Sequence, residues 1–185
     1  MIVLLDTNIV ANCLLARNVP ELVDCETILK YCAKGRLTGF VNLPTLATTW
    51  YLMRKMNDGA RREKLRKLCS FINLANTELA MVQQAIDNDA FPDFEDNLQD
   101  CCARQIHADY IVTTNIKDFF GHSQVPAITP DDLLALLTLQ SWRQLPPSAG
   151  EVREASSADY GSLLVTRRWR LPGQTRYSHC HELQR

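Results

Sequence analysis

The sequence predicts an α/β protein with a parallel sheet. Short, continuous apolar runs, typical of strands buried on both faces, alternate along the chain with longer segments whose apolar residues recur every three or four positions. Such alternation indicates βαβ units, in which each connection between parallel strands is right-handed. Residues 1–139 carry this pattern and are predicted to form one domain.

The predicted strands are short, and the first is the clearest. Ile2–Leu5 is an unbroken apolar run that ends at Asp6. The other strand candidates are residues 37–43, 71–74, 110–113 and 125–129. Five strands of this length suffice for one sheet of ordinary size.

Helices are predicted between these strands. Asp6 or Thr7 can cap a first helix that runs through Leu14, because a side-chain oxygen at this position accepts from the free backbone N–H groups of the first turn. The other predicted helices are Pro20 to Lys34 with Gly35 at its C-cap, a helix opened by Pro44 and broken by Gly59, one through Leu65 and Cys69, one from Thr77 to Ile86, Asp93 to His107, and one that Pro130 starts.

Length and charge divide the chain into an acidic body and a basic remainder. The 185 residues exceed one ordinary domain, and the net charge is −1. From Ser141 to Arg185 there are seven Arg and four acidic residues, a balance of +3, so residues 1–140 carry 13 basic and 17 acidic groups, or −4. We expect residues 140–185 to be an Arg-rich appendage, partly ordered or disordered. An acidic body argues against a broad nucleic-acid-binding surface and concentrates carboxylates where a cation can sit.

Several classes of protein are disfavoured. No Gly-rich loop follows the first strand, and no HExxH, CxxC or GxSxG motif is present. The number of cysteines, seven, is odd, and no two of them have the close spacing typical of metal ligands, so we expect reduced thiols. No apolar run approaches the roughly 20 residues that a membrane span needs. We therefore expect a cytoplasmic protein without a membrane partner.

Acidic and amide side chains stand at the ends of two predicted strands and at one helix start. Asp6 follows the first strand, while Asn115 and Asp118 follow the strand at residues 110–113. Asp93, Glu95 and Asp96 open the helix before that strand. Sites in open parallel sheets form at the carboxyl ends of strands, where the strand order reverses. If the first and fourth strands are neighbours, these side chains face one crevice.

Gathered carboxylates repel one another unless a cation holds them. Mg²⁺ and Mn²⁺ prefer oxygen ligands and keep waters for a phosphate substrate, and such an ion activates water for phosphodiester hydrolysis. The alternative reading is structural, since Asp after a strand commonly caps a helix and first-turn acids complement the helix dipole.

Four segments together resemble the PIN-domain ribonuclease family. They are Asp6-Thr7-Asn8, Pro44 to Lys55, Asp93 to Gln99 (DFEDNLQ) and Tyr110 to Phe119 (YIVTTNIKDF), and they span residues 1–139 in order and spacing. The resemblance implies a three-layer α/β/α sandwich with a central parallel sheet of about five strands. It also implies a Mg²⁺- or Mn²⁺-dependent ribonuclease. Many small bacterial members are VapC-like toxins, neutralised by an antitoxin and often dimeric, so the expected partners are an RNA substrate, an antitoxin protein and a second copy of the chain.

The resemblance also implies roles for particular residues. Asp6, Asp96 and Asn115 would ligate the metal and act in catalysis, and Asp118 would assist catalysis. Asp93, Glu95, Asn8 and Thr49 would support these ligands or hold a second metal ion, and the expected RNA-binding residues are Arg54 and Lys55. One departure stands out: relatives place a Glu on the helix corresponding to residues 44–55, where this chain has Thr48 or Thr49.

Two functions follow. The first is a metal-dependent endoribonuclease, the toxin component of a toxin–antitoxin pair. The alternative is a PIN-fold module that binds RNA or protein through a degraded, catalytically weak or inactive metal site, because a Thr hydroxyl is a poor substitute for a carboxylate ligand.

Overall fold

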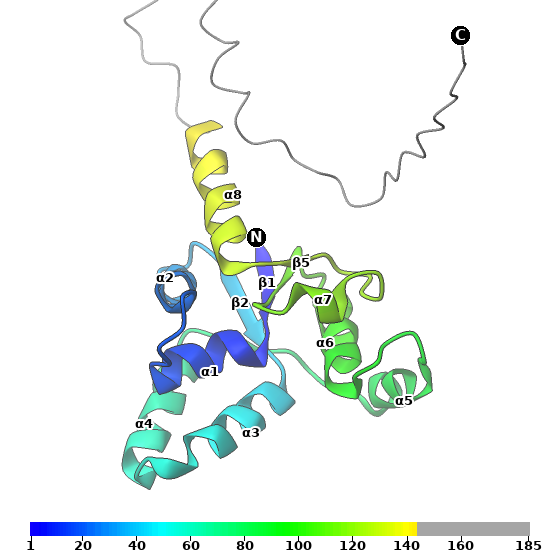
Figure 1. Cartoon of the computed structure of the whole chain (residues 1–185), viewed down its shortest axis with the longest axis horizontal. Coiled ribbons are helices and arrows are strands. Elements are labelled where there is room, and N and C mark those ends of the chain that lie inside the picture. The colour runs from blue at the N-terminus through cyan, green and yellow to red at the C-terminus, as the bar shows by residue number, and fades with distance from the viewer. Residues whose placement is uncertain (144–185) are drawn as a thin grey trace, which may run out of the picture. The chain divides into compact units, whose positions relative to one another are not determined.

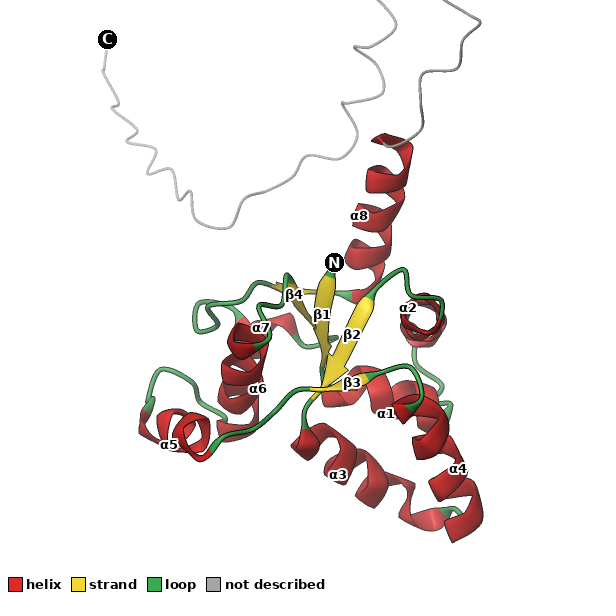
Figure 2. Cartoon of the chain, turned by 180° about the vertical axis from the view of Figure 1, so that it is seen from behind, coloured by secondary structure: helices red, strands yellow, loops and turns green. Residues whose placement is uncertain are grey.

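A computed structural model describes residues 1–143, and its centre is a parallel five-stranded sheet (Figure 2). The strands are β1 (Ile2–Leu5), β2 (Thr38–Val41), β3 (Asn73–Leu74), β4 (Tyr110–Val112) and β5 (Ala127–Ile128). Their spatial order is β3-β2-β1-β4-β5, and every neighbouring pair is parallel. All five predicted strands are confirmed, each within the range expected from the sequence.

Helices cover both faces of the sheet, which gives the expected three layers (Figure 1). The helices are α1 (Thr7–Leu15), α2 (Leu22–Ala33), α3 (Leu43–Leu52), the 3-10 turn η1 (Met53–Lys55), α4 (Asp58–Cys69), α5 (Leu79–Asp87), α6 (Phe94–Gln105), α7 (Ile116–Phe119) and α8 (Pro130–Arg143). Side chains of α1, α2, α3, α4 and α8 pack in the core on one face, and those of α5, α6 and α7 in the core on the other. The α/β/α sandwich is therefore confirmed.

Strand β1 shows why its apolar run is continuous. Val3 and Leu5 belong to the core beneath α1 and α2, whereas Leu4 belongs to the core beneath α6. All three side chains are fully buried. Because successive strand residues point to opposite faces, a strand between two helix layers needs apolar residues at every position.

Strand β2 passes so close to its neighbours that one position has room only for glycine. A Cβ atom at Gly39 would lie 2.7 Å from the Sγ of Cys32 on α2 and 2.8 Å from the Cδ1 of Ile72. Gly35 at the end of α2 has a φ of +68°, so it ends this helix in the left-handed conformation that favours glycine, as the sequence predicts.

Two local predictions are corrected. Gly59 does not break a helix, because α3 already ends at Leu52 and Gly59 lies in the first turn of α4. The break comes from Asn57, whose Oδ1 accepts from the N–H of Ala60 at 2.9 Å and caps α4. The short helix α7 was not expected, since Ile116–Phe119 is only one turn long and has no apolar period of its own.

The C-terminal end of the described region is α8. This helix continues to Arg143, beyond the predicted domain end at residue 139, and the rest of the expected appendage at 140–185 lies outside the described residues. Within residues 1–143 no helix is long and apolar enough to cross a membrane.

Candidate functional site

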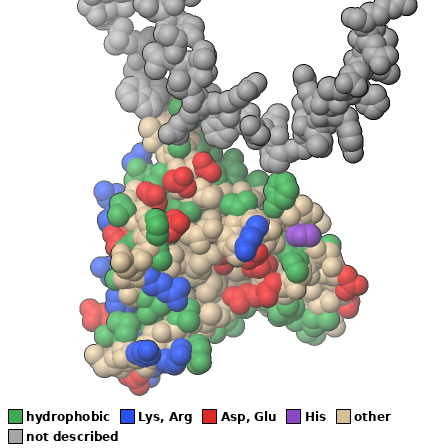
Figure 3. Space-filling view, viewed as in Figure 1, with side chains coloured by type: hydrophobic (Ala, Val, Ile, Leu, Met, Phe, Trp, Pro, Cys, Tyr) green, Lys and Arg blue, Asp and Glu red, His purple; other side chains and the backbone are tan. Residues whose placement is uncertain are grey.

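The order of the strands brings the polar residues after β1 and β4 together. Leu5 on β1 pairs with Val112 on β4, and the N–H of Asp6 donates to the carbonyl of Val112 at 3.0 Å. The N-terminal turn of α6 lies beside these strand ends. Together they form a cavity of about 320 Å³ lined by Asp6, Thr7, Asn8, Ala11, Arg17, Leu52, Asp93, Glu95, Asp96, Gln99, Asn115, Asp118 and Phe119. We call it the acid cavity; Figure 3 shows acidic side chains gathered on this face of the molecule.

Asp6 is buried and is held by hydrogen bonds on both carboxylate oxygens. Gln99 Nε2 donates to Oδ1 at 2.8 Å, and Thr113 Oγ1 donates to Oδ2 at 2.7 Å. The amides of Thr7 (backbone) and Asn8 (side chain) also donate to this carboxylate. Burial raises the pKa of Asp6 above its ordinary value, and these hydrogen bonds oppose that rise. The carboxylate is therefore fixed in one orientation.

Asp96 experiences the combined charge of the cavity. Burial, followed by the negative charges of Asp6, Asp93, Asp118 and Glu95, raises the pKa of Asp96 to about 7. No Lys or Arg forms an ion pair with Asp96 among the described residues. The negative charge at this position is therefore poorly compensated by the protein itself.

Asn115 and Asp118 are joined to each other and to the strand end. The side-chain amide of Asn115 donates to Asp118 Oδ2, and the backbone N–H of Asn115 donates to Thr113 Oγ1 at 2.9 Å. Thr113 thus contacts both Asp6 and Asn115. The one-turn helix α7 keeps Asp118 next to Asn115.

The other acidic candidates on α6 have structural contacts in addition to lining the cavity. Asp93 caps α6, since its Oδ1 accepts from the N–H groups of Glu95 at 2.7 Å and Asp96 at 3.2 Å. Glu95 Oε1 accepts from Thr7 Oγ1 at 2.9 Å, and Thr7 Oγ1 lies 3.1 Å from Thr45 Oγ1 on α3. A chain of hydroxyl groups therefore links Glu95 to α3.

Helix α3 brings no carboxylate to the cavity. Thr49 is fully buried, its hydroxyl has no partner among the described residues, and it is not one of the residues that line the acid cavity. Leu52 is the α3 residue that lines it, and Thr45 is the one linked to its edge. Glu95 is thus the acidic side chain directed toward α3.

The expected RNA-binding residues lie outside the acid cavity. Arg54 and Lys55 are exposed on η1, and the Arg54 guanidinium stacks 4.4 Å from the ring centre of Tyr51. Neither side chain lines the cavity, although Leu52 does so from the adjacent turn.

Four residues of the site did not appear among the sequence-based candidates: Thr7, Arg17, Gln99 and Thr113. Gln99 follows Asp96 by three residues, and this spacing on a helix was a usable signal, because residues i and i+3 share a face. Arg17 had no such signal. It follows Ala16, whose φ of 48° turns the chain at the end of α1.

Five carboxylates and several amide groups line the acid cavity, and their oxygen atoms suit a divalent cation. Within residues 1–143 no three His, Cys, Asp or Glu side chains are close enough together to hold a metal ion. Asp6, Asp96 and Asn115, the ligands expected from the sequence, all line the cavity, and two carboxylates with one amide oxygen could hold an ion there. Gln99 supports this fit, because its Oε1 is buried without a hydrogen-bond partner while its Nε2 orients Asp6. Oxygen donors of this kind are those that Mg²⁺ and Mn²⁺ prefer.

The fold resembles solved structures. The crystal structure of VapBC2 from Rickettsia felis bound to a DNA fragment from their promoter matches with a TM-score of 0.54 and 20% identity, over 70% of this chain and 98% of that chain. VapC20 from Mycobacterium tuberculosis, described as a Sarcin-Ricin loop cleaving toxin, matches with a TM-score of 0.45 and 15% identity, over 59% and 86% of the two chains. No curated protein matches the sequence.

The family is shown by a sequence model, whereas the likeness to the Rickettsia felis structure, at 20% identity, establishes only the fold. The PIN domain model matches residues 2–117, which is more than half of the chain. The matched range contains Asp6, Asp96 and Asn115. The chain therefore belongs to the PIN domain family.

Proposed function

We propose that this protein is a metal-dependent endoribonuclease and the toxin component of a toxin–antitoxin pair. The observation that carries the nuclease proposal is the convergence of Asp6, Asp96 and Asn115 in one cavity where the pKa of Asp96 is raised to about 7. Perturbed carboxylates in a cavity are typical of functional sites. Membership of the PIN domain family supports the same reaction. The toxin role is supported by the fold shared with VapBC2 from Rickettsia felis.

In this proposal some residues bind the metal ion and others orient those ligands. Asp6, Asp96 and Asn115 would hold the cation; Gln99 and Thr113 orient Asp6, and Asp118 orients Asn115. When bound, Mg²⁺ or Mn²⁺ supplies activation of water and stabilisation of the charge that builds on the phosphate. Glu95, directed toward α3 by Thr7, supplies negative charge on the side where α3 has none.

The nuclease proposal is tested by incubating the purified chain with structured RNA and Mn²⁺. Asp6→Asn and Asp96→Asn are expected to abolish cleavage, whereas the control Asp87→Asn, an exposed acid on α5, leaves it unchanged. Cleavage at the same rate by the wild type and by both site variants would refute the proposal.

The second candidate is a PIN-fold binding module whose metal site is degraded. The observation that favours it is the α3 side of the cavity, where Leu52 stands and no carboxylate does. Titration calorimetry separates the two. The nuclease proposal requires heat of binding for Mg²⁺ or Mn²⁺ at about millimolar concentration, and a chain that binds neither ion there is the binding module.

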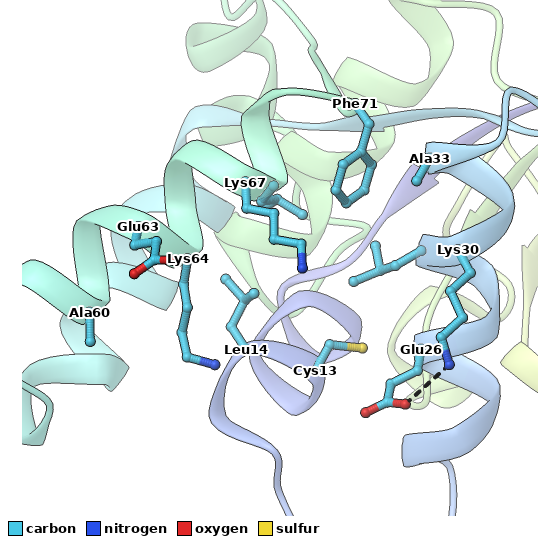
Figure 4. Close-up of a pocket in the computed structure, with 12 residues that line it drawn as sticks. Cys13, Leu14, Glu26, Lys30, Ala33, Ala60, Glu63, Lys64, Lys67 and Phe71 are labelled. Carbon is cyan, nitrogen blue, oxygen red and sulfur yellow. Dashed lines mark hydrogen bonds and ion pairs between the residues drawn. The ribbon is translucent and has the colours of Figure 1, made fainter.

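A groove between α1, α2 and α4 supports the proposal of an antitoxin partner (Figure 4). It measures about 500 Å³, with an apolar floor that includes Leu14, Leu68 and Phe71. Its rim carries three Lys and two Glu: Lys30, Lys64, Lys67, Glu26 and Glu63. Lys30 pairs with Glu26 at 3.5 Å, so the rest of the rim, Lys64, Lys67 and Glu63, has an excess of one positive charge. We therefore propose that the groove takes an apolar helix with acidic flanks from the antitoxin.

Where a neighbouring gene encodes a small protein, co-expression of the two chains tests this partner. Phe71→Glu is expected to prevent a complex that the wild type forms, while Asp87→Asn leaves it intact. A complex that survives Phe71→Glu contradicts the groove as the docking site.

We also propose that the chain is a homodimer, which the molar mass measured by light scattering checks directly.

A further inference from the structure

A third pocket combines an aromatic ring with arginines. It lies between α3 and α4, measures about 300 Å³ and is lined by Trp50, Arg62, Leu65, Arg66 and Cys69. We call it the Trp50 pocket. It shares no lining residue with the acid cavity or with the groove of Figure 4.

Arg61 holds the indole ring of Trp50 in place. Its guanidinium lies 3.6 Å from the ring centre, its Nη2 donates to the carbonyl of Trp50 at 3.0 Å, and its Nη1 pairs with Asp58 at 2.9 Å. The charge of Arg61 is therefore already engaged. Arg62 lies farther away, at 5.6 Å from the same ring centre, and has no ion-pair partner among residues 1–143. The pocket is thus lined by an indole ring that Arg61 holds through stacking, beside an Arg62 guanidinium without an ion-pair partner among the described residues.

The cations of α4 are sorted by type between its two sides. Lys64 and Lys67 reach toward the groove, as Figure 4 shows, whereas Arg62 and Arg66 line the Trp50 pocket. Guanidinium groups bind phosphate through paired hydrogen bonds and stack on flat rings, which an ammonium group does less well. The side with arginines and an aromatic ring has the chemistry of a nucleotide site.

A second ring–arginine pair lies next to Trp50 in the sequence, at the end of α3. Tyr51 is 61% exposed, and Arg54 stacks on it at 4.4 Å. An exposed ring of this size is a platform on which an unpaired base can stack. Arg54, the expected RNA-binding residue, thus stacks on an exposed ring that directly follows Trp50 in the sequence, although neither Tyr51 nor Arg54 lines the pocket.

We propose that the Trp50 pocket binds an unpaired base and an adjoining phosphate of single-stranded RNA, and so holds the substrate of the acid cavity. This inference rests on the proposed nuclease function. The acid cavity repels a polyanion until a cation is present, so RNA affinity has to come from elsewhere on the surface. The two places are joined by α3, because Leu52 lines the cavity and Trp50, two residues earlier on the same helix, lines the pocket.

Fluorescence of Trp50 tests the proposal directly. The chain has three Trp, so the full-length double variant Trp142→Phe, Trp169→Phe leaves Trp50 as the single indole. Single-stranded RNA of about ten nucleotides is titrated in EDTA, where metal-dependent cleavage stops. We expect base stacking to quench the fluorescence. Arg62→Gln combined with Arg66→Gln should weaken RNA binding about tenfold or more and reduce the slope of log affinity against log salt.

Arg36→Gln is a control for the loss of a ring-stacked arginine elsewhere on the surface, to be compared with Arg62→Gln alone as well as with the double variant. Arg36 also stacks on a tyrosine, Tyr31 at 4.5 Å, but it lies outside the pocket, so its replacement should leave RNA binding unchanged. RNA binding that is unaffected by the Arg62 and Arg66 changes overturns the inference, as does quenching by an acidic peptide but not by RNA. Failure of the nuclease proposal looks different: the wild type would cut no RNA, while quenching and its loss in the variant would still be seen.

Discussion

Replacing Asp96 by Asn is expected to stabilise the metal-free protein while it removes a metal ligand. The pKa of Asp96 rises from its ordinary value of 3.8 to about 7, which is about three units. At about 1.4 kcal/mol per unit the charged side chain would cost at most about 4 kcal/mol of folding free energy at neutral pH. Because Asp96 is only partly buried, solvent screening reduces this figure, and we expect about 1 kcal/mol.

The direction of the pH dependence follows from the raised pKa. Between pH 4 and 7 the unfolded chain has already lost the proton of Asp96 and the folded chain still holds it, so the stability of the wild type falls as the pH rises through this range. The Asn side chain has no proton to lose in this range, so it makes no such pH-dependent contribution to the stability of the variant. The difference in stability should therefore be smallest near pH 4 and largest above pH 7.

Thermal unfolding in EDTA at pH 4 and pH 8 measures this difference. At pH 8 the melting temperature of Asp96→Asn should exceed that of the wild type by about 2 to 6 °C. Added Mn²⁺ should then raise the melting temperature of the wild type and not that of the variant. Asp87→Asn controls for loss of one negative charge from the surface. A variant that is less stable than the wild type at pH 8 in EDTA would show that Asp96 is well compensated, and the reasoning from repulsion would be wrong.

Three further substitutions test the packing and the support of the site. Gly39→Ala should lower the free energy of unfolding by about 1–3 kcal/mol because its methyl group meets β2's neighbours, while Gly59→Ala in α4 changes it by no more than about 1 kcal/mol; equal effects would contradict the close approach at β2. Asp100→Ala should cost about 2–4 kcal/mol, as measured by urea unfolding, because three donors and Arg104 lose their buried acceptor; a cost below 1 kcal/mol would be inconsistent with these bonds. Gln99→Leu should weaken Mn²⁺ binding by about tenfold in calorimetry because Asp6 loses one donor, and unchanged affinity would remove Gln99 from the support of the site.

Local signals explain which parts of the fold were predictable. The apolar run of β1, the cap at Asp6 and the acids at the start of α6 each depend on residues within one or two turns of one another, so the sequence displays them directly. Gly59 misled because glycine weakens helix interiors, yet its position in the first turn of α4 is tolerated. The Asn57 cap two residues earlier was the correct boundary signal.

By itself, the sequence determined the class of the protein: an α/β chain whose acids and amides follow the strands that parallel sheets use for sites. Tertiary structure decided which of these residues meet. Asp6 is 93 residues from Gln99 and 107 residues from Thr113, and these contacts exist only because β4 pairs with β1 and α6 packs against their ends. It also decided that Thr45, and not Thr49, connects α3 to the site. Periodicity reports which face of an element is buried, whereas a hydrogen bond between distant segments depends on the order in which the strands pack.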